Sequence, residues 1–236
     1  MVLSMKKKGL FVTFEGGEGV GKSTQIKLLE RVLVESGHEV IHTQDPQGTV
    51  IGMKIRGIVL EKELKELTPK TELLLFLAAR AQLVSEIIKP GVEAGKIVIS
   101  DRFYHSTLAY QGGARELGIE EVRRLNDYAI ADIHPDLTFL LDLPPEVGFD
   151  RMRPKNGKGK ELPKNQINLS LHLSSDMPRL DTDRIEREGA NFHEKVRQAF
   201  LQLAREEPHR VVVLDATRPV EEIAAEIKRR VIEKLG

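Results

Sequence analysis

Short apolar runs recur along the chain and carry the β-branched and aromatic residues that favour strands. They lie at residues 10–14, 39–43, 96–101, 137–142 and 210–215. Helical segments separate these runs, at residues 24–33, 51–60, 69–88, 119–130, 145–152 and 219–234. Strands that alternate with helices at this spacing favour a parallel sheet with helices on both faces. The sequence therefore predicts a three-layer α/β/α fold with a five-stranded parallel sheet.

The helix at residues 69–88 has a clear start signal. Thr68 is suited to cap the helix and Pro69 to occupy its first position. We expect this helix to end at Ile88, because Pro90 follows. Apolar residues surround most of its surface, so the sequence also predicts that the helix is buried.

Residues 154–178 differ in composition from the rest of the chain. A basic, glycine-containing run at 155–160 precedes an alternating run at 167–173. We expect residues 1–236 to form a single domain in which residues 153–180 are an insertion. We interpret the insertion as a lid, or flap. A solvated surface insertion is the alternative for its tip.

A glycine-rich run follows the first strand and fits the phosphate-binding pattern G-x-x-x-x-G-K-[ST] at every fixed position. Its residues are Gly16, Gly17, Glu18, Gly19, Val20, Gly21, Lys22 and Ser23, and Thr24 follows in the helix. Such a loop points backbone N–H groups at a phosphate, and the helix N-terminus adds partial positive charge. We expect Lys22 to reach the terminal phosphates and the Ser23 hydroxyl to ligate Mg²⁺. A turn that binds nothing is the alternative.

Composition narrows the class of protein. Lys and Arg number 36, as do Asp and Glu, so the formal net charge is zero and the basic surplus usual for nucleic-acid binding is missing. The sequence has no cysteine, which excludes disulfides and thiolate metal sites. The apolar runs are far too short to span a membrane. We therefore expect a cytoplasmic protein without a nucleic-acid or membrane partner.

Further polar residues follow the third predicted strand. The carboxyl ends of parallel strands share one rim of the sheet, so Asp101 and Arg102 should lie beside the glycine-rich loop and residues 44–49. Asp101 can hold the shell of a magnesium ion, and Arg102 can bind a phosphate through two N–H groups. A structural ion pair is the alternative for this dipeptide.

Phe76 and Arg80 are four residues apart and so share a helix face. Together they can stack on a nucleobase and donate to its carbonyl, although plain core packing is the alternative for Phe76. Glu18 is unusual inside a phosphate loop, because an acid there faces an anionic ligand. It can instead face a sugar hydroxyl of a phosphate acceptor.

A longer motif supports the prediction of a nucleotide-binding site. Residues 101–115, DRFYHSTLAYQGGAR, match the pattern D-R-[YFH]-x-x-S-T-x-A-Y-Q-G-x-x-R at every fixed position. In this run the chain resembles the thymidylate kinase family, P-loop enzymes that phosphorylate dTMP to dTDP with ATP in dTTP synthesis. Residues 11–16, 19–25 and 183–186 are similar to other parts of that family. The resemblance covers residues 9–153 and 179–236, and it implies Mg²⁺ as cofactor and a homodimer.

The resemblance implies roles for individual residues. In the acceptor site, Phe76 would stack on thymine, Arg80 would bind its O4 atom, and Arg102 would hold the acceptor phosphate. Thr107 and Tyr110 would line the base and deoxyribose, Gln111 would help close the pocket, and Glu18 would approach the 3′-hydroxyl. On the donor side, the loop at residues 217–219, with Arg218, would pack on adenine. Lys22, Arg102, Glu18 and Arg179 would be the catalytic residues, and Ser23 and Asp101 would hold the metal.

Two departures from the family pattern stand out. The family often has Arg-Glu-Pro-Gly-Gly-Thr where residues 44–49 read QDPQGT, so one arginine is missing; Arg56 can compensate. The insertion is also longer and poorer in arginine than the usual lid. Gly19 occupies the position where some members carry a catalytic arginine, and members with glycine there supply the arginine from the lid. By its distance from residue 183, Arg179 is the expected lid arginine, and Arg153 is the second candidate.

Two alternative functions remain open, and so does the predicted homodimer. A kinase for another nucleoside monophosphate would use the same fold. A GTP-binding switch is the second rival, because residues 45–48 fit D-x-x-G, but the chain has no N-K-x-D run for guanine. For the homodimer, we expect the helix at 70–88 and the residues Val122, Leu125 and Ala129 to offer surfaces; packing in the core is the alternative for both.

Overall fold

A five-stranded parallel sheet forms the centre of the computed structural model, which describes residues 9–153 and 183–236. Within those residues the strand order is β2-β3-β1-β4-β5, and all four pairings are parallel. The strands are β1 (Leu10–Glu15), β2 (Val40–Gln44), β3 (Ile97–Asp101), β4 (Leu137–Asp142) and β5 (Val211–Asp215). The predicted α/β fold is confirmed, and every strand ends at the same rim.

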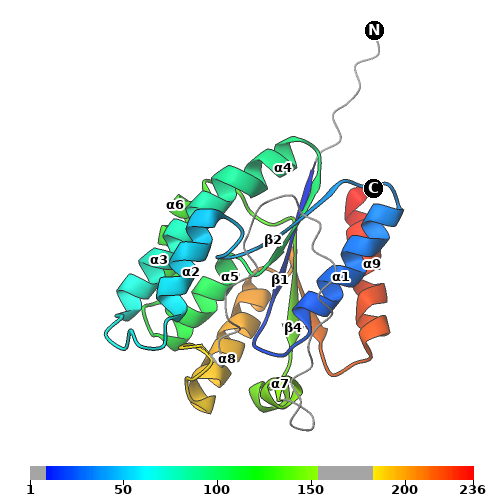
Figure 1. Cartoon of the computed structure of the whole chain (residues 1–236). Helices are drawn as coiled ribbons and strands as arrows, with labels where there is room; N and C mark the ends of the chain where they lie inside the picture. The colour runs from blue at the N-terminus through cyan, green and yellow to red at the C-terminus, as the bar shows by residue number, and fades with distance from the viewer. Residues whose placement is uncertain (1–8, 154–182) are drawn as a thin grey trace.

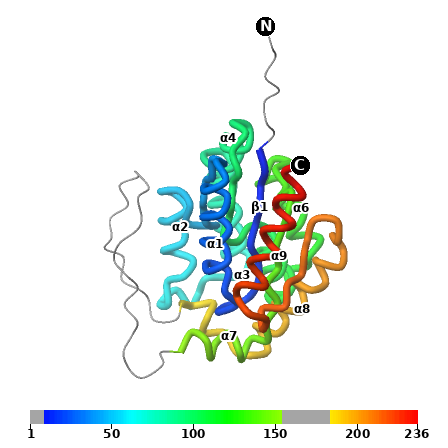
Figure 2. The backbone as a smooth tube through the Cα atoms, turned by 90° about the vertical axis from the view of Figure 1, so that its right-hand side faces the viewer, coloured from blue at the N-terminus to red at the C-terminus, as the bar shows by residue number. Residues whose placement is uncertain are grey.

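Helices cover both faces of this sheet, as Figures 1 and 2 show. One face carries α1 (Lys22–Glu35) and α9 (Val220–Leu235). The other face carries α3 (Pro69–Leu83), α5 (Tyr104–Thr107), the π-helix η2 (Leu108–Ala114) and α8 (Ala190–Glu206). The helices α2 (Val50–Leu60) and α6 (Ile119–Ile130) pack against α3, and α7 (Pro145–Met152) lies at the rim. No helix among the described residues has the length and apolar character needed to cross a bilayer.

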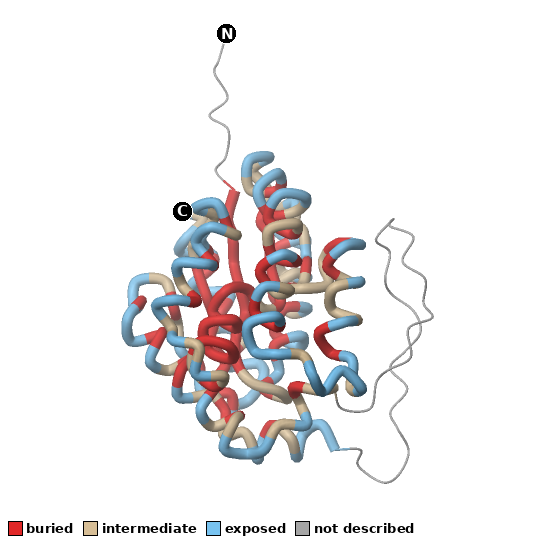
Figure 3. The backbone as a smooth tube through the Cα atoms, turned by 90° about the vertical axis from the view of Figure 1, so that its left-hand side faces the viewer, coloured by how far each residue is buried: buried red, intermediate tan, exposed pale blue. Residues whose placement is uncertain are grey.

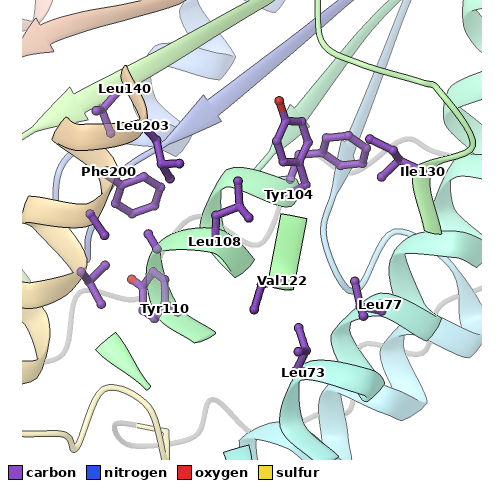
Figure 4. Packing of buried hydrophobic residues seen from close by; sticks show 14 of the residues in the cluster. Leu73, Leu77, Tyr104, Leu108, Tyr110, Val122, Ile130, Leu140, Phe200 and Leu203 are labelled. Atoms are coloured by element: carbon purple, nitrogen blue, oxygen red, sulfur yellow. The ribbon is translucent and has the colours of Figure 1, made fainter. Parts of the chain in front are cut away.

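The two cores follow from the alternation of side chains along the strands. In β1, Leu10, Val12 and Phe14 face the core beneath α1 and α9, whereas Phe11 faces the second core. Figure 3 shows buried backbone at the centre of the molecule: the inner strands β1, β3 and β4 are buried almost throughout, whereas the outer strands β2 and β5 are partly exposed. Figure 4 shows residues of α3, α6, η2 and α8 meeting in the second core, which fixes these helices beside the rim.

The helix predicted for residues 69–88 differs from the expectation in two ways. It does not stop before Pro90: a π-helical turn, η1 (Val84–Ile88), leads directly into α4 (Lys89–Glu93). Pro90 lies in the first turn of α4, where the N–H that proline lacks is least needed. The helix is also not buried all round, because Leu74 is 59% exposed.

Two helical segments lie where the sequence analysis placed none. The run α5–η2 carries the motif that follows Arg102, and α8 packs across it. The buried residues Val196, Phe200 and Leu203 of α8 recur at helical spacing, so this periodicity could have revealed the helix.

Candidate active site

The glycine-rich loop joins β1 to α1 as predicted. Gly16, Gly19 and Gly21 have φ angles of 131°, 67° and 98°, in the left-handed region that favours glycine. The Lys22 Nζ atom donates to the carbonyl oxygens of Gly16 at 3.1 Å and Gly17 at 2.8 Å. Burial, helped by the nearby charge of Arg102, lowers the pKa of Lys22 to about 8. The loop thus holds a buried amine at the position where a phosphate would bind.

The backbone of α7 packs closely against the glycine-rich loop. A Cβ atom on Gly19 would lie only 2.7 Å from the carbonyl carbon of Gly148. Gly148 is also the only buried residue among the eight of α7, all of which are described. Since position 19 combines a positive φ with this close approach, a side chain such as arginine does not fit there.

The predicted metal ligands come together at the rim. The Ser23 Oγ atom donates to Oδ2 of Asp101 at 3.3 Å. Asp101 is buried, and its Oδ1 atom has no hydrogen-bond partner among the described residues. An unpartnered carboxylate oxygen beside a hydroxyl is a donor set that suits Mg²⁺, which prefers oxygen ligands. These two residues therefore fit the expected ion.

Arg102 joins the loop to the acceptor side of the site. Its guanidinium donates to Oε1 of Glu18 at 2.6 Å and to the Gly16 carbonyl oxygen at 2.9 Å. It also lies over the ring of Tyr110, 5.4 Å from the centroid, and the Tyr110 hydroxyl donates to Glu18 at 3.0 Å. Burial alone would raise the pKa of Glu18, but Arg102 and then Lys22 outweigh it and hold that pKa below its usual value. Glu18 and Arg102 therefore form an ion pair.

A residue that the sequence analysis did not single out holds Arg102 in place. Glu15, at the end of β1, accepts hydrogen bonds from the Phe103 N–H at 2.8 Å and the Ser106 hydroxyl at 2.6 Å. These bonds anchor the start of α5, directly after Arg102, whose φ of 67° is strained for a residue with a side chain. The only local signal was an acid closing an otherwise uncharged strand.

A cleft with about 890 Å³ of open space adjoins this ion pair. All the residues predicted for the acceptor site line it: Phe76, Arg80, Arg102, Thr107, Tyr110, Gln111 and Glu18. Arg56, the suggested substitute for the missing arginine, also lines it. Residues that had no predicted role line it too: Gln44, Asp45, Pro46, Leu60, Ser106, Asp183, Ile185 and Glu186. The fold thus gathers the acceptor candidates, Arg56 included, from four separate stretches of sequence.

Arg80 is held rigidly within the cleft wall, where it is only 1% exposed. Its Nε atom donates to Oδ2 of Asp45 at 2.6 Å and its Nη1 atom to Oδ1 of Asn126 at 2.6 Å. Its Nη2 atom donates to the Phe103 carbonyl oxygen at 3.4 Å. A guanidinium has five N–H groups, so two remain outside these bonds.

Comparison with known proteins identifies the family to which the chain is related. The family model described as thymidylate kinase matches residues 14–227. A thymidylate kinase of Maridesulfovibrio salexigens is 43% identical over 226 residues, which cover 96% of each chain. That of Oenococcus oeni is 44% identical over 230 residues, covering 97% of this chain and 98% of its own. The crystal structure of thymidylate kinase from Ehrlichia chaffeensis superposes with a TM-score of 0.68 at 28% identity, covering 95% of this chain and 98% of that one.

The chain belongs to the thymidylate kinase family. The resemblance found in residues 101–115 is thereby confirmed, and the GTP-binding switch has no support. Thymidylate kinases are phosphotransferases, so the chain is an enzyme. The roles of individual residues stay predictions.

Two arginines with a predicted role, Arg218 and Arg153, do not line the cleft of this thymidylate kinase family member. Arg218 is drawn toward α9, where it donates to Glu222 at 3.4 Å and Glu226 at 2.9 Å. Arg153, the second candidate for the lid arginine, is exposed and paired with Asp150 at 2.8 Å. Arg179 and the predicted lid at 154–178 lie outside the described residues. The single-domain arrangement with a lid therefore stays a prediction.

Proposed function

We propose that the chain transfers the γ-phosphoryl group of ATP to dTMP, giving dTDP. The observation that carries the proposal is the pairing of Arg102 with Glu18: it joins the phosphate loop to the acceptor cleft. A donor nucleotide on the loop and an acceptor nucleotide in the cleft would thus meet at one arginine. Membership of the thymidylate kinase family supports dTMP as the acceptor.

The polar groups of the cleft suit thymine. Arg80 offers N–H donors, which match the O4 acceptor of thymine. Gln111 lies in the same cleft, and its amide oxygen would accept from the N3–H group. Phe76, half-buried in the wall, offers a ring to stack on. We assign Thr107 and Tyr110 to the base and deoxyribose, and Glu18 to the region of the 3′-hydroxyl.

The reaction needs positioning and charge rather than a protein nucleophile. An oxygen of the acceptor phosphate attacks the γ-phosphorus, and the bond from γ-phosphorus to the bridging oxygen of ADP breaks. Lys22 and the loop N–H groups would hold the ATP phosphates, and Arg102 would hold the acceptor phosphate in line. Mg²⁺ held by Ser23 and Asp101 would neutralise phosphate charge.

We also propose that Arg179 supplies the transition-state arginine. The left-handed, closely approached backbone at Gly19 supports this assignment, because the loop itself has no room for an arginine there. Replacing Arg179 by Ala should lower kcat by roughly 100-fold with little change in dTMP binding. Arg179→Lys should restore only part of the rate, since an ammonium cannot bind two oxygens in a fork. A normal kcat for Arg179→Ala with a loss for Arg153→Ala would transfer the role to Arg153.

We propose a homodimer in the cytoplasm. Exposed apolar side chains occupy the adjacent helices α2, α3 and α6: Ile51, Ile58, Leu74, Leu125 and Tyr128. A second copy would bury them. Val122, expected on this surface, is instead fully buried in the core. Light scattering at micromolar concentration tests the assembly, and a monomer would disprove it.

Coupled release of ADP tests the main proposal. The purified chain with ATP and Mg²⁺ is assayed with dTMP, dUMP, dCMP, dGMP, dAMP and UMP. We expect dTMP to have the highest kcat/KM. A different preferred acceptor would favour the rival reading, a kinase for another nucleoside monophosphate.

A further inference from the structure

The amide of Gln111 is anchored from behind by Glu72 of α3. The Gln111 Nε2 atom donates to Oε1 of Glu72 at 2.7 Å. Glu72 is 1% exposed, so this bond is buried in the wall and not in the cleft. None of the hydrogen bonds among the described residues engages the Oε1 atom of Gln111, and Gln111 lines the cleft. The free amide oxygen is therefore the atom available to a ligand.

Glu72 can hold only the nitrogen of that amide. An ionised carboxylate accepts hydrogen bonds and cannot donate them. Burial would raise the pKa of Glu72, but its bonds with Arg184 and Gln111, and the charge of Arg115, hold that pKa below its usual value. Arg115 Nε lies 3.3 Å from Oε1, and Arg184 Nη2 donates to Oε2. With the carboxylate ionised, a flipped Gln111 would set oxygen against oxygen.

We propose that Glu72 determines the class of acceptor base by locking the orientation of Gln111. The inference rests on the proposed function and deepens it. With Gln111 locked, the cleft presents donors from Arg80 and an acceptor from Gln111. Thymine and uracil have the matching order, an O4 acceptor beside an N3–H donor. Cytosine has the reverse order, a 4-amino donor beside an N3 acceptor, so both of its polar groups would be opposed.

The substitution Glu72→Gln releases this lock. Arg184 attracts the oxygen of the introduced amide to the position of Oε2, because Arg184 donates to that atom alone, whereas Arg115 donates to both oxygens and favours neither orientation. The introduced NH₂ then faces Gln111, which must flip to accept from it. After the flip, Gln111 shows an N–H group to the cleft, and that group suits N3 of cytosine.

Steady-state kinetics of Glu72→Gln on dTMP, dUMP and dCMP test the proposal. We expect the ratio of kcat/KM for dTMP over dCMP to fall roughly 10- to 100-fold, the effect of one exchanged hydrogen bond in a buried site. The ratio for dTMP over dUMP should stay as in the wild type, because both bases present the same edge. Equal losses for all three substrates would show a purely structural role and overturn the proposal, as would an unchanged ratio of dTMP to dCMP.

Two further variants keep the test decisive if Glu72→Gln does not fold. Gln111→Leu removes the amide and leaves Glu72 with its arginines; dTMP and dUMP should lose roughly tenfold in kcat/KM while dCMP does not. A parallel loss for dCMP would overturn the reading of N3–H by Gln111. Arg115→Lys is the matched control, since it alters another donor to Glu72 and should leave the dTMP-to-dCMP ratio unchanged. A wild-type chain inactive on dTMP would refute the proposed function instead.

Discussion

Replacing Gly148 by Ala tests whether α7 sets the shape of the phosphate loop. A Cβ atom there would lie closer than 3.0 Å to the Glu18 carbonyl oxygen and 3.3 Å from its carbonyl carbon. Both are backbone atoms, so no side-chain rotation relieves the clash. Either the loop or the start of α7 must shift. Glu18 lies inside the loop, and any shift of its peptide would redirect the N–H groups expected to bind ATP.

The magnitude follows from the cost of overpacking. An inserted methyl in a tight site costs roughly 1–3 kcal/mol. If the loop absorbs this strain, kcat/KM for ATP should fall roughly 5- to 160-fold, since each 1.36 kcal/mol is a factor of ten. In a chain of this size the same strain should lower Tm by roughly 2–12 °C. We expect this cost to be divided between the two effects, because Lys22 and Arg102 tie the loop to the site while Gly148 anchors α7.

Initial rates with varied ATP at saturating dTMP, together with a thermal melt, measure the two effects. Gly57→Ala is the control: a Cβ atom at Gly57, in α2, would meet no atom within 4 Å. It should raise the free energy of unfolding by roughly 0.5–1 kcal/mol and leave ATP kinetics unchanged. Wild-type kcat/KM for ATP in Gly148→Ala, even with a lower Tm, would refute the link between α7 and the loop.

Three further predictions concern charge. Arg56→Ala should raise the KM for dTMP roughly tenfold and change kcat little. The reason is that Arg56 lines the cleft and supplies a positive charge there, whereas Gln44, at the position of the missing arginine, is neutral. An unchanged KM would show that Arg102 suffices to hold the acceptor phosphate. Because the pKa of Lys22 is about 8, kcat/KM for ATP should fall as pH rises through 8 and the ammonium is lost; a flat profile from pH 7 to 9 would contradict this. Glu207 is buried, and its Oε2 atom accepts from Arg210 Nε at 2.6 Å and lies 3.1 Å from His105 Nε2. Glu207→Ala should therefore lower the free energy of unfolding at pH 7 by roughly 3–5 kcal/mol, as measured by chemical denaturation. These partners hold the pKa of Glu207 below its usual value despite its burial, so the stability that it contributes is present above about pH 4.5 and lost as pH falls.

The sequence by itself determined the sheet, the phosphate loop and the family. Strand and helix periods are local properties, and the strands in the structure start and end within one residue of their predicted positions. The phosphate loop and residues 101–115 are contiguous motifs, so their chemistry could be read without a fold. The rule that ligands bind at the carboxyl ends of parallel strands then brought Asp101 and Arg102 to the loop correctly.

Only the tertiary structure decided which side chains hold the site in place. Glu15 bonds to a segment some ninety residues away, and Glu72 bonds to Gln111, 39 residues away. Gly19 and Gly148 approach because the phosphate loop and α7 meet at the rim, not because either sequence signals it. Such pairings depend on how the layers pack, since hydrogen bonds between distant segments leave no periodic trace in the chain. The sequence thus names the groups that could act on a nucleotide, and the packing of α3, α5, η2 and α7 fixes the direction in which those groups point.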